Sequence, residues 1–390
     1  MTTTTTHPTT TTHTATAPDG AVAATTAAGT AQPLLRPADF GDFQLPNRVV
    51  MAPTTRARAA GPGLVPTDLH AVHYGQRAGA GLIVAEGTWV SERAIGFVHV
   101  PGIYHEAQIA GWRQVTDVVH ALGGRIVLQL WHTGAASHPA HLGGALPGGP
   151  SAVNPHERSF TATGFQDTVT PREMSRAEIA TTVADFRTAA ENARRAGFDG
   201  VEIGALGSFL IAQFLNPRLN LRTDAYGTDR AGRRRLLLEI IDAVAEPWDG
   251  RRVGVRLSPY WTSGDTFTAD AETLAAYDEL VAELNDRPVA YLHLRGPETA
   301  GAGGTPDFAA FARYRRRFDG PFIANLGFDR DSGNALVEEG GADAVSYARH
   351  FIANPDLVTR FALDRELAAG DPSTYYTGDA RGYVDYPVSA

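Results

Sequence analysis

The sequence contains no lysine and no cysteine, and each absence excludes a kind of chemistry. All 34 basic residues are arginine, which rules out a Schiff-base lysine and the lysine of a Walker A phosphate loop. Without cysteine the chain has no disulfide, no thiol nucleophile and no cysteine-ligated zinc. The formal net charge of −9 argues against broad contact with nucleic acid or with an anionic membrane surface.

Long apolar runs are missing too, since no segment approaches the roughly 20 apolar residues of a membrane span. Residues 1–34 are a Thr/Ala-rich tract whose one charged side chain is Asp19. The tract has no basic start and no continuous apolar stretch, so it is not typical of a secretory signal, and we expect a cytoplasmic location. It also lacks the bulky apolar residues that offset ordering entropy. We therefore predict a disordered tail over 1–34 and a folded domain over 35–390.

From residue 48 onward, short apolar runs alternate with amphipathic segments. Eight runs are typical of buried strands and cover residues 48–53, 81–87, 125–131, 200–204, 252–258, 290–295, 322–327 and 344–349. Eight strand-then-helix units without interruption favour an α/β fold of the closed (β/α)8, or TIM-barrel, type in a single domain. The alternative is an open doubly wound sheet, which is disfavoured because no strand-to-helix turn contains GxGxxG.

The connecting segments carry readable start and stop signals. Ser175 and Glu178 form a capping box that predicts a helix ending at Gly197. Asn354-Pro355 predicts a last helix with proline at its first position. Residues 40–48 are expected to form a hairpin that closes the bottom of the barrel, and residues 132–174, after the third strand, a loop that caps the top.

The chemistry of a (β/α)8 barrel sits at the carboxyl ends of its strands. Here those ends offer hydrogen-bonding groups, arginines and glycines but few general acids or bases, in particular Gln129, Arg256, Asn325 and Arg349. Such a set suits the binding of a large, flat cofactor with a phosphate better than hydrolysis. The histidines of the capping loop, His132, His138 and His141, have no carboxylate close by, so we predict no metal site.

At this point the motifs match a known family. The chain from about residue 35 to 387 resembles the old yellow enzymes, FMN-dependent ene-reductases on a (β/α)8 barrel. The matching motifs are NRVVMAPTTRARA (47–59), GLIVAEGT (81–88), PGIY (101–104), VLQLWHTG (127–134), QFLNPRLNLRTDAYG (213–227), VRLSPY (255–260), RHFIANPDL (349–357) and STYYTGDARGYVDYP (373–387).

The resemblance implies a set of FMN contacts. Thr55 would reach the flavin edge, Gln129 the pyrimidine ring, and Arg256 the N1/O2 edge where negative charge develops on reduction. Gly327 and Arg349 would hold the phosphate. The complete expected cofactor set is Pro53, Thr54, Thr55, Gly87, Gln129, Arg256, Asn325, Leu326, Gly327, Ala348 and Arg349.

The sequence departs from the family at the bend after the fourth strand. The family has a histidine there, then an asparagine or histidine, then a tyrosine; these hold the substrate and the nicotinamide and supply a proton. This chain has Gly204, Gly207 and Phe209 at those positions. We expect a roomier, less polar substrate pocket, formed by Gly204, Leu206, Gly207, Phe209, Trp89, Trp131, Trp261 and Tyr376. The catalytic proton carrier is left open, with Tyr376, Tyr260, Tyr104 and His132 as candidates.

The hypothesis from the sequence is an FMN-dependent oxidoreductase of secondary metabolism that exchanges hydride with a specialised, rather apolar small molecule. Reduction of a double bond and the reverse desaturation both stay open, with NAD(P)H as a possible reductant. The alternatives are a flavin-dependent isomerase or cyclase and a flavin-binding protein without catalysis. We expect no nucleic-acid or membrane partner, and the sequence leaves monomer and homodimer equally open.

Overall fold

The central feature of the computed structural model, which describes residues 1–2, 32–299 and 304–388, is a closed barrel of parallel strands. In chain order they are β3 (Val49–Met51), β4 (Leu82–Trp89), β5 (Ile126–Trp131), β10 (Gly200–Ala205), β11 (Val253–Leu257), β12 (Val289–Arg295), β13 (Phe322–Asn325) and β14 (Ala344–Tyr347). Each strand pairs with the next, and β14 pairs with β3 to close the ring. The predicted (β/α)8 barrel is confirmed and the open sheet is excluded.

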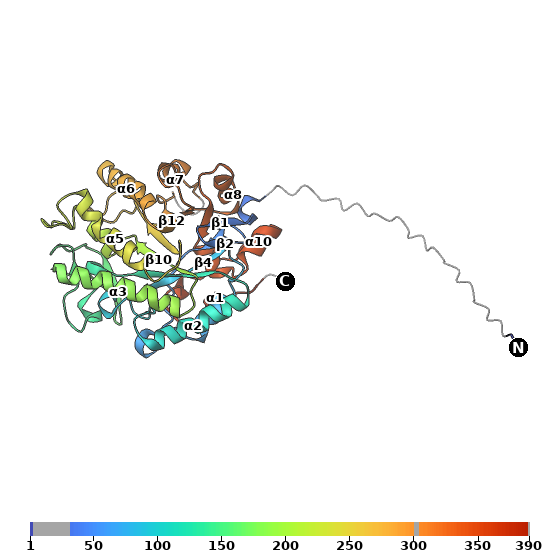
Figure 1. The fold of residues 1–390 in the computed structure, drawn as a ribbon. Coiled ribbons are helices and arrows are strands. Elements are labelled where there is room, and N and C mark those ends of the chain that lie inside the picture. Colours follow the sequence, from blue (N-terminus) through green and yellow to red (C-terminus); the bar gives the residue numbers. More distant parts are fainter. Residues whose placement is uncertain (3–31, 300–303, 389–390) are drawn as a thin grey trace. The chain divides into compact units, whose positions relative to one another are not determined.

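Helices surround the strands (Figure 1). They are α1 (Asp68–Gly75), α2 (Glu106–Ala121), α3 (Arg176–Arg195), α4 (Leu210–Leu215), α5 (Arg230–Ala245), α6 (Ala271–Glu283), α7 (Phe308–Arg315), α8 (Arg330–Glu338), α9 (Arg349–Ala353) and α10 (Leu357–Leu363). Short 3-10 turns are η1 (Pro33–Leu35), η2 (Pro62–Leu64), η3 (Glu92–Ala94), η4 (Gly134–Ala136), η5 (Pro139–His141), η6 (Leu284–Asp286) and η7 (Pro372–Thr374). No helix among the described residues is both long and apolar enough to cross a bilayer.

The local signals in the sequence explain most helix boundaries. Ser175 caps α3 by accepting from the Glu178 amide, and the Glu178 side chain returns a bond to Ser175, which confirms the capping box. Gly197 follows α3 with φ +88°, a conformation that favours glycine. The prediction for Pro355 was wrong: α10 begins at Leu357 with Asp356 as its N-cap residue, so the proline precedes the helix.

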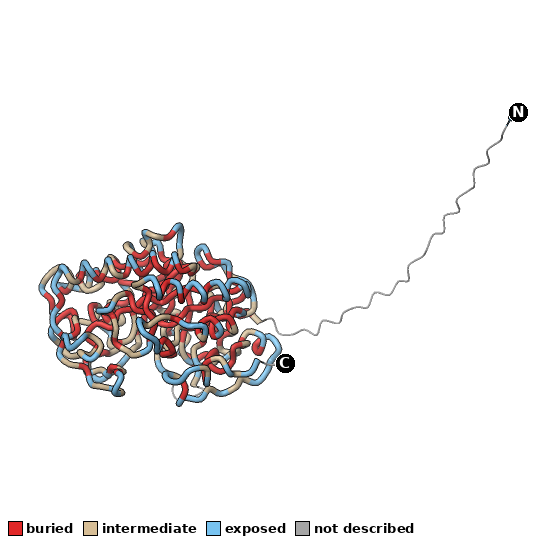
Figure 2. Tube along the Cα trace, turned by 90° about the horizontal axis from the view of Figure 1, so that it is seen from below, coloured by how far each residue is buried: buried red, intermediate tan, exposed pale blue. Residues whose placement is uncertain are grey.

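The lower part of the barrel is filled with apolar side chains. Val50, Val84, Val127 and Ile323 come from four strands and pack in one cluster. A hairpin of β1 (Ala38–Phe40) and β2 (Phe43–Leu45) adds Phe40, Phe43 and Leu45 to the same cluster. The predicted hairpin therefore exists and closes the barrel's lower end. Figure 2 shows the buried chain concentrated at the centre of this unit.

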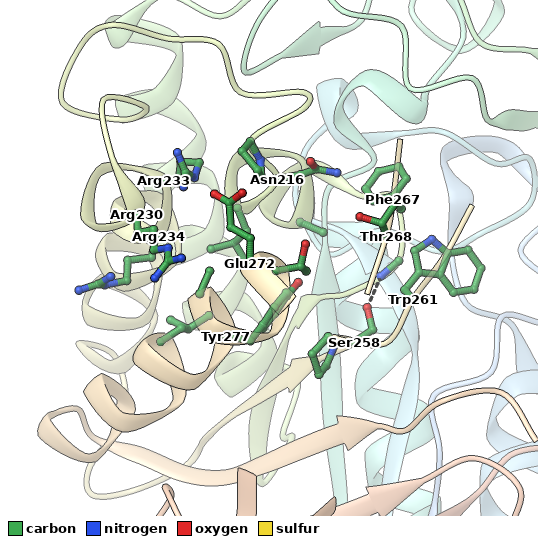
Figure 3. A pocket seen from close by; sticks show the side chains of 18 residues that line it. Asn216, Arg230, Arg233, Arg234, Ser258, Trp261, Phe267, Thr268, Glu272 and Tyr277 are labelled. Carbon is green, nitrogen blue, oxygen red and sulfur yellow. Dashed lines mark hydrogen bonds between the residues drawn. The ribbon is translucent and has the colours of Figure 1, made fainter. Parts of the chain in front are cut away.

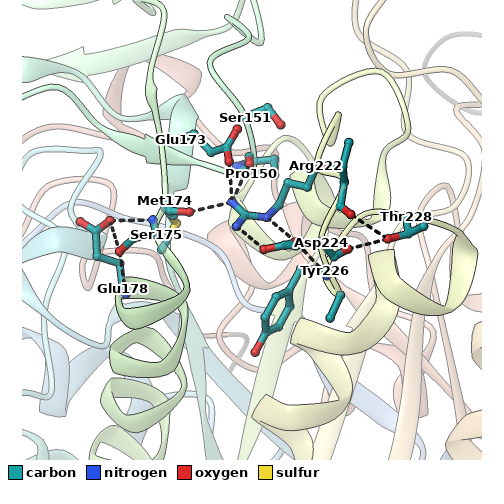
Figure 4. Close-up of polar contacts among 12 residues, drawn as sticks. Pro150, Ser151, Glu173, Met174, Ser175, Glu178, Arg222, Asp224, Tyr226 and Thr228 are labelled. Atoms are coloured by element: carbon teal, nitrogen blue, oxygen red, sulfur yellow. Dashed lines mark hydrogen bonds and ion pairs between the residues drawn. The ribbon is translucent and has the colours of Figure 1, made fainter.

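The segment after β5 forms a separate small structure before α3. It contains β6 (Gly148–Gly149), β7 (Arg158–Thr161), β8 (Gly164–Asp167) and β9 (Arg172–Glu173), paired as β6 with β9 and β7 with β8. Arg222, from the segment after α4, fastens it by donating to the carbonyls of Pro150 and Met174 at 3.1 and 2.6 Å (Figure 4). Asp224 orients the same guanidinium through two hydrogen bonds.

The predicted tail over residues 1–34 lies almost wholly outside the described residues, which begin again at Gln32. From Gln32 onward the chain clusters into one compact unit.

Candidate active site

Above the apolar layer, the barrel interior changes to a chain of buried polar side chains. Gln129 on β5 donates from Nε2 to Oε1 of Glu202 on β10 at 2.8 Å. The other carboxylate oxygen of Glu202 lies 2.8 Å from Nδ1 of His293 on β12. Nε2 of His293 lies 2.8 Å from Oγ of Ser346 on β14. All four side chains are buried, and four strands thus contribute to one network.

The charge state of this network follows from its burial. Burial lowers the pKa of His293, although Glu202 opposes the shift, so the ring is neutral at pH 7. Burial alone would raise the pKa of Glu202, but His293, Arg256 and the hydrogen bonds outweigh it and the pKa lies below its ordinary value. A neutral His293 donates from Nδ1 to an ionised Glu202 and accepts at Nε2 from the Ser346 hydroxyl.

An ionised Glu202 can only accept, so it fixes the orientation of the Gln129 amide. The amide nitrogen faces Glu202, which leaves the carbonyl oxygen of Gln129 without a protein partner among the described residues. The Gln129 amide therefore offers a free carbonyl oxygen next to its N–H group, and this pair complements the acceptor and donor groups on the pyrimidine edge of a flavin.

Arg256 on β11 is the charged group of this layer. It is 6 % exposed, and its Nη2 donates to Oδ1 of Asn325 at 2.8 Å, while its buried Nε has no partner within the described chain. Burial lowers its pKa to about 10, so it is still charged at pH 7. A buried guanidinium with an unsatisfied donor is costly unless an electron-rich group meets it. The position therefore fits the ring edge of FMN that becomes negative on reduction.

The ends of β13 and β14 fit a phosphate. Leu326 and Gly327 have φ values of +95° and +83°, and both turn the chain in a conformation that only glycine adopts freely. Ala348 precedes Arg349, whose side chain is exposed and forms no ion pair with the residues that the structure describes. At the end of β3, Pro53, Thr54 and Thr55 are half-buried, and Thr54 donates to the carbonyl of Ala52.

An aromatic wall stands over one side of the barrel's upper end. Trp131 stacks on Trp89 with a centroid distance of 4.7 Å and meets the edge of Phe209 at 4.5 Å. Phe97 stacks on the indole of Trp131 with a centroid distance of 5.8 Å. Trp89 has no exposed surface, so it supports Trp131 from behind and does not offer a face to a substrate, contrary to our expectation. A Cβ at Gly87 would lie 2.7 Å from the Trp131 ring, so packing alone already requires this glycine.

The bend after β10 carries no titratable side chain. Gly204 is buried and a Cβ there would lie 3.2 Å from the carbonyl of Leu130. Gly207 has φ +61° and donates its amide to Oγ of Ser258 at 2.8 Å. Leu206 and Phe209 are half-buried, so the bend presents backbone and apolar side chains.

The four candidate proton carriers occupy different places. The Tyr260 hydroxyl donates to the carbonyl of Ala310 at 3.2 Å. His132 and Tyr104 both line a partly open cavity of about 570 Å³ between η3, the capping segment and α3. Burial, with help from Arg93, lowers the pKa of His132 to about 3, and its Nδ1 accepts from the Gly134 amide. The Tyr260 hydroxyl and the His132 ring are thus engaged and Tyr104 lines that cavity, whereas Tyr376 is 53 % exposed and its hydroxyl makes no hydrogen bond to the described residues.

The segment that carries Tyr376 is fixed to the end of β3. Arg56 donates to the carbonyls of Tyr375 and Gly382, and Arg58 donates to that of Thr374 at 2.8 Å. Both guanidinium groups lie over the ring of buried Tyr383, at 5.3 and 5.0 Å. This clamp, together with Glu202 and Ser346, was missed at the sequence level. Glu202 had a signal, because a charged residue inside a buried strand demands partners.

Trp261, the last of the expected substrate contacts, lies outside the aromatic wall. It is half-buried in the loop after β11, where the Arg295 guanidinium lies 4.8 Å from its ring centroid. The residue lines a groove between α5 and α6 and does not contact Trp131 or Phe209 through its ring. The side chains that the structure brings together above the polar layer are therefore Trp131, Phe209 and the bend.

The comparisons with known proteins agree with this geometry. The NADH:flavin oxidoreductase / NADH oxidase family matches residues 33–368. The 12-oxophytodienoate reductase 1 of Oryza sativa subsp. japonica is 41 % identical over 369 residues, which cover 93 % of this chain and 95 % of that protein. The 12-oxophytodienoate reductase 2 of Arabidopsis thaliana is 40 % identical over 370 residues, 91 % of this chain and 95 % of that protein.

Solved structures give the same answer. Morphinone reductase superposes with a TM-score of 0.87 at 43 % identity, over 92 % of this chain and 97 % of that chain. The old yellow enzyme homologue from Zymomonas mobilis reaches a TM-score of 0.84 at 35 % identity, over 91 % of this chain and 99 % of that chain. Fold, polar layer and sequence therefore agree: this chain belongs to the old yellow enzyme family of NADH:flavin oxidoreductases and is an FMN-dependent oxidoreductase.

Proposed function

We propose that this protein reduces an activated carbon–carbon double bond in a specialised, rather apolar substrate of secondary metabolism, in the cytoplasm. FMN, when bound, supplies the hydride. The direction of reduction is supported by the relatives, which are named as reductases of 12-oxophytodienoate and of morphinone. The apolar character of the substrate is supported by Trp131, Phe209 and Leu206 at the barrel's upper end.

The observation that carries the proposal is the contrast between two neighbouring layers. The polar layer has Gln129, Arg256 and Asn325 in place, and the buried Nε–H of Arg256 has no hydrogen-bond partner among the described residues. The bend beside it has glycine at 204 and 207 and phenylalanine at 209. The protein can therefore bind the cofactor, but it must hold its substrate by stacking and shape.

The reductant is proposed to be NAD(P)H. Morphinone reductase has been solved in complex with tetrahydroNAD, at 43 % identity to this chain and a TM-score of 0.85. Since the bend offers no side-chain donors at 204 and 207, we expect slow reduction and weak discrimination between NADH and NADPH. The exposed hydroxyl of Tyr376 is the proposed proton source, because the hydroxyl of Tyr260 is engaged and both His132 and Tyr104 line another cavity.

The experiment is to introduce the missing groups as Gly204→His, Gly207→Asn and Phe209→Tyr and to measure reduction of 2-cyclohexenone. At position 207 the backbone accepts the change, since Asn tolerates φ +61° and a Cβ there meets nothing closer than the Phe209 ring at 3.7 Å. At position 204 a Cβ would lie 3.2 Å from the Leu130 carbonyl, so the backbone there must shift by a few tenths of an ångström. One donor of this kind is worth about 10²–10³ in rate and a positioned acid about 10²–10⁴. We expect a gain in kcat/KM of at least about 10² over the parent.

The matched control is Gly204→Ala, Gly207→Ala and Phe209→Leu, which changes the same positions without adding donors. An equal response of the two triple variants would show that the bend does not face the reacting carbon. Anaerobic mixing of the parent with NADPH and NADH, followed at the flavin absorbance band, tests the reductant. Failure to bleach with either, combined with bleaching by a saturated substrate, would instead support desaturation. Turnover without any change in flavin absorbance would support an isomerase or cyclase.

A further inference from the structure

A groove runs along the outer side of the bend, away from the polar layer. It lies between α4, α5, α6 and the loop after β11, and it is narrow and partly open to solvent (Figure 3). One end is formed by Trp261 and by Gly207, whose backbone amide donates a hydrogen bond to Oγ of Ser258. The groove thus begins at the back of the same bend that faces the aromatic wall.

The walls of the groove are largely apolar. Leu215 comes from α4, Phe267 from the loop after β11, and Tyr277 and Leu280 from α6. The free space between them is narrow, so an extended alkyl chain fits better than a fused ring system. Each methylene that leaves water for such a wall contributes about 0.8 kcal/mol.

Three arginines of α5 line the outer end of the groove, and they differ in whether an acidic partner neutralises them. Arg230 lies 2.7 Å from Glu279, and Arg234 pairs with Glu279 and Glu283, so both are neutralised. Arg233 lines the groove between them and forms no ion pair with the described part of the chain, and its buried Nε has no hydrogen-bond partner. In Figure 3 Arg233 and Trp261 lie on opposite sides of the groove.

One carboxylate also faces this space. Glu272 of α6 lines the groove, is exposed and has no ion-pair partner within 4 Å among the described residues. It is therefore a weak, solvated competitor for the Arg233 guanidinium and does not neutralise it.

We propose that this groove binds an aliphatic carboxylate, with its chain along the apolar walls toward Gly207 and its carboxylate on Arg233. An apolar channel that ends in an unpaired guanidinium is complementary to this ligand class and to no neutral one. The proposal does not rest on the proposed reductase activity, because binding is measured without turnover.

The test is calorimetric titration of the FMN-loaded protein with octanoate, with octanol and butyrate as probes that lack the charge or the chain. Octanoate is expected to bind tightest, and butyrate to lose about 4-fold per missing methylene. Arg233→Gln should weaken octanoate on the order of 10-fold or more, since a charged hydrogen bond is lost. Arg235→Gln removes the same charge from the same helix at an exposed residue that does not line the groove, and should change binding less than about 3-fold. Glu272→Gln should tighten octanoate by about 2-fold to 5-fold.

Three results would overturn the proposal: no saturable octanoate binding below about 10 mM, octanol binding as tightly as octanoate, or equal losses in Arg233→Gln and Arg235→Gln at unchanged thermal midpoints. The flavin absorbance during the titration identifies the source of the carboxylate. A change in the flavin spectrum on saturation means that the alkyl chain of octanoate extends past Gly207 toward the flavin, as the tail of a substrate would. Binding without spectral change assigns the groove to a separate molecule, and both cases support the site.

Discussion

The polar layer makes a sharp prediction for Glu202→Gln. The wild-type carboxylate accepts two hydrogen bonds at 2.8 Å, from Gln129 and from His293, and all three side chains are buried. It is also the one carboxylate whose charge supports the buried guanidinium of Arg256. Glutamine has nearly the same shape, so the substitution removes the charge and leaves the packing almost unchanged.

The magnitude follows from the two bonds and the charge. A charge-assisted hydrogen bond contributes about 1.5–3 kcal/mol and a neutral one about 0.5–1.5. Two weakened bonds therefore cost about 2–3 kcal/mol of the free energy of unfolding. With less negative charge below the flavin, its reduced, anionic form gains relative to the oxidised one. A change of about 1–2 kcal/mol corresponds to a midpoint potential more positive by about 20–45 mV.

The assays are urea unfolding and potentiometric titration of the bound flavin. Glu366→Gln is the matched control, since Glu366 is exposed and its side chain makes no bond to the described residues. We expect this control to stay within about 0.5 kcal/mol of the parent, with an unchanged potential. If Glu202→Gln gave the same small effects as Glu366→Gln, the argument that Glu202 sets the charge balance under the flavin would be wrong.

Two further predictions concern the loops around the site. The pKa of His132 is lowered to about 3, so the stability that its neutral ring contributes is fully present above pH 6.5 and is lost as the pH falls below that value. Asn at this position can still accept from the Gly134 amide. Between pH 7.5 and pH 5, the free energy of unfolding of His132→Asn, measured in urea, should therefore fall by about 2 kcal/mol less than that of the parent. Leu326 has φ +95°, so Leu326→Gly should relieve backbone strain and raise the free energy of unfolding by about 1 kcal/mol. Gly327→Ala should lower the free energy of unfolding, because its Cβ would lie 2.5 Å from the Thr299 methyl group. Equal effects of the two substitutions in calorimetric melting would refute the strain argument.

The positions of the strands could be predicted because each is a short apolar run between turn signals. The runs at 125–131 and 200–204, for example, became β5 (Ile126–Trp131) and β10 (Gly200–Ala205). Helix ends depended on single residues, and the choice between Pro355 and Asp356 as a boundary was decided by the N-cap geometry of α10. The existence of a strand or helix was therefore easier to predict than the residues at which it begins and ends.

The partners inside the barrel could not be predicted, because they depend on the register between strands. Glu202 stands beside Gln129 since β10 pairs with β5 at that step, and Arg256 stands beside His293 through the pairing of β11 with β12. A shift by one residue would turn these side chains out of the barrel. The groove at Arg233 was hidden for the same kind of reason, since its walls come from α4, α5, α6 and a loop.

The polar layer also bears on whether the bend has lost its chemistry or exchanged it. Glu202, His293 and Arg256 occupy space in a barrel core where apolar side chains of similar volume would be neutral or stabilising by about 1–4 kcal/mol. An unsatisfied N–H on Arg256 adds to this cost in the protein alone, and it is recovered only when an electron-rich group binds. The buried polar groups of this core are thus fully satisfied only when a flavin is bound above them. Next to that core, Gly204 and Gly207 present only backbone and Phe209 packs against the edge of Trp131, so the bend adds no buried charge. The polar layer that would bind the cofactor thus lowers the stability of the protein without FMN, whereas the bend that would contact the substrate contains no buried charge. This arrangement is expected if the protein still uses a flavin but acts on a different substrate.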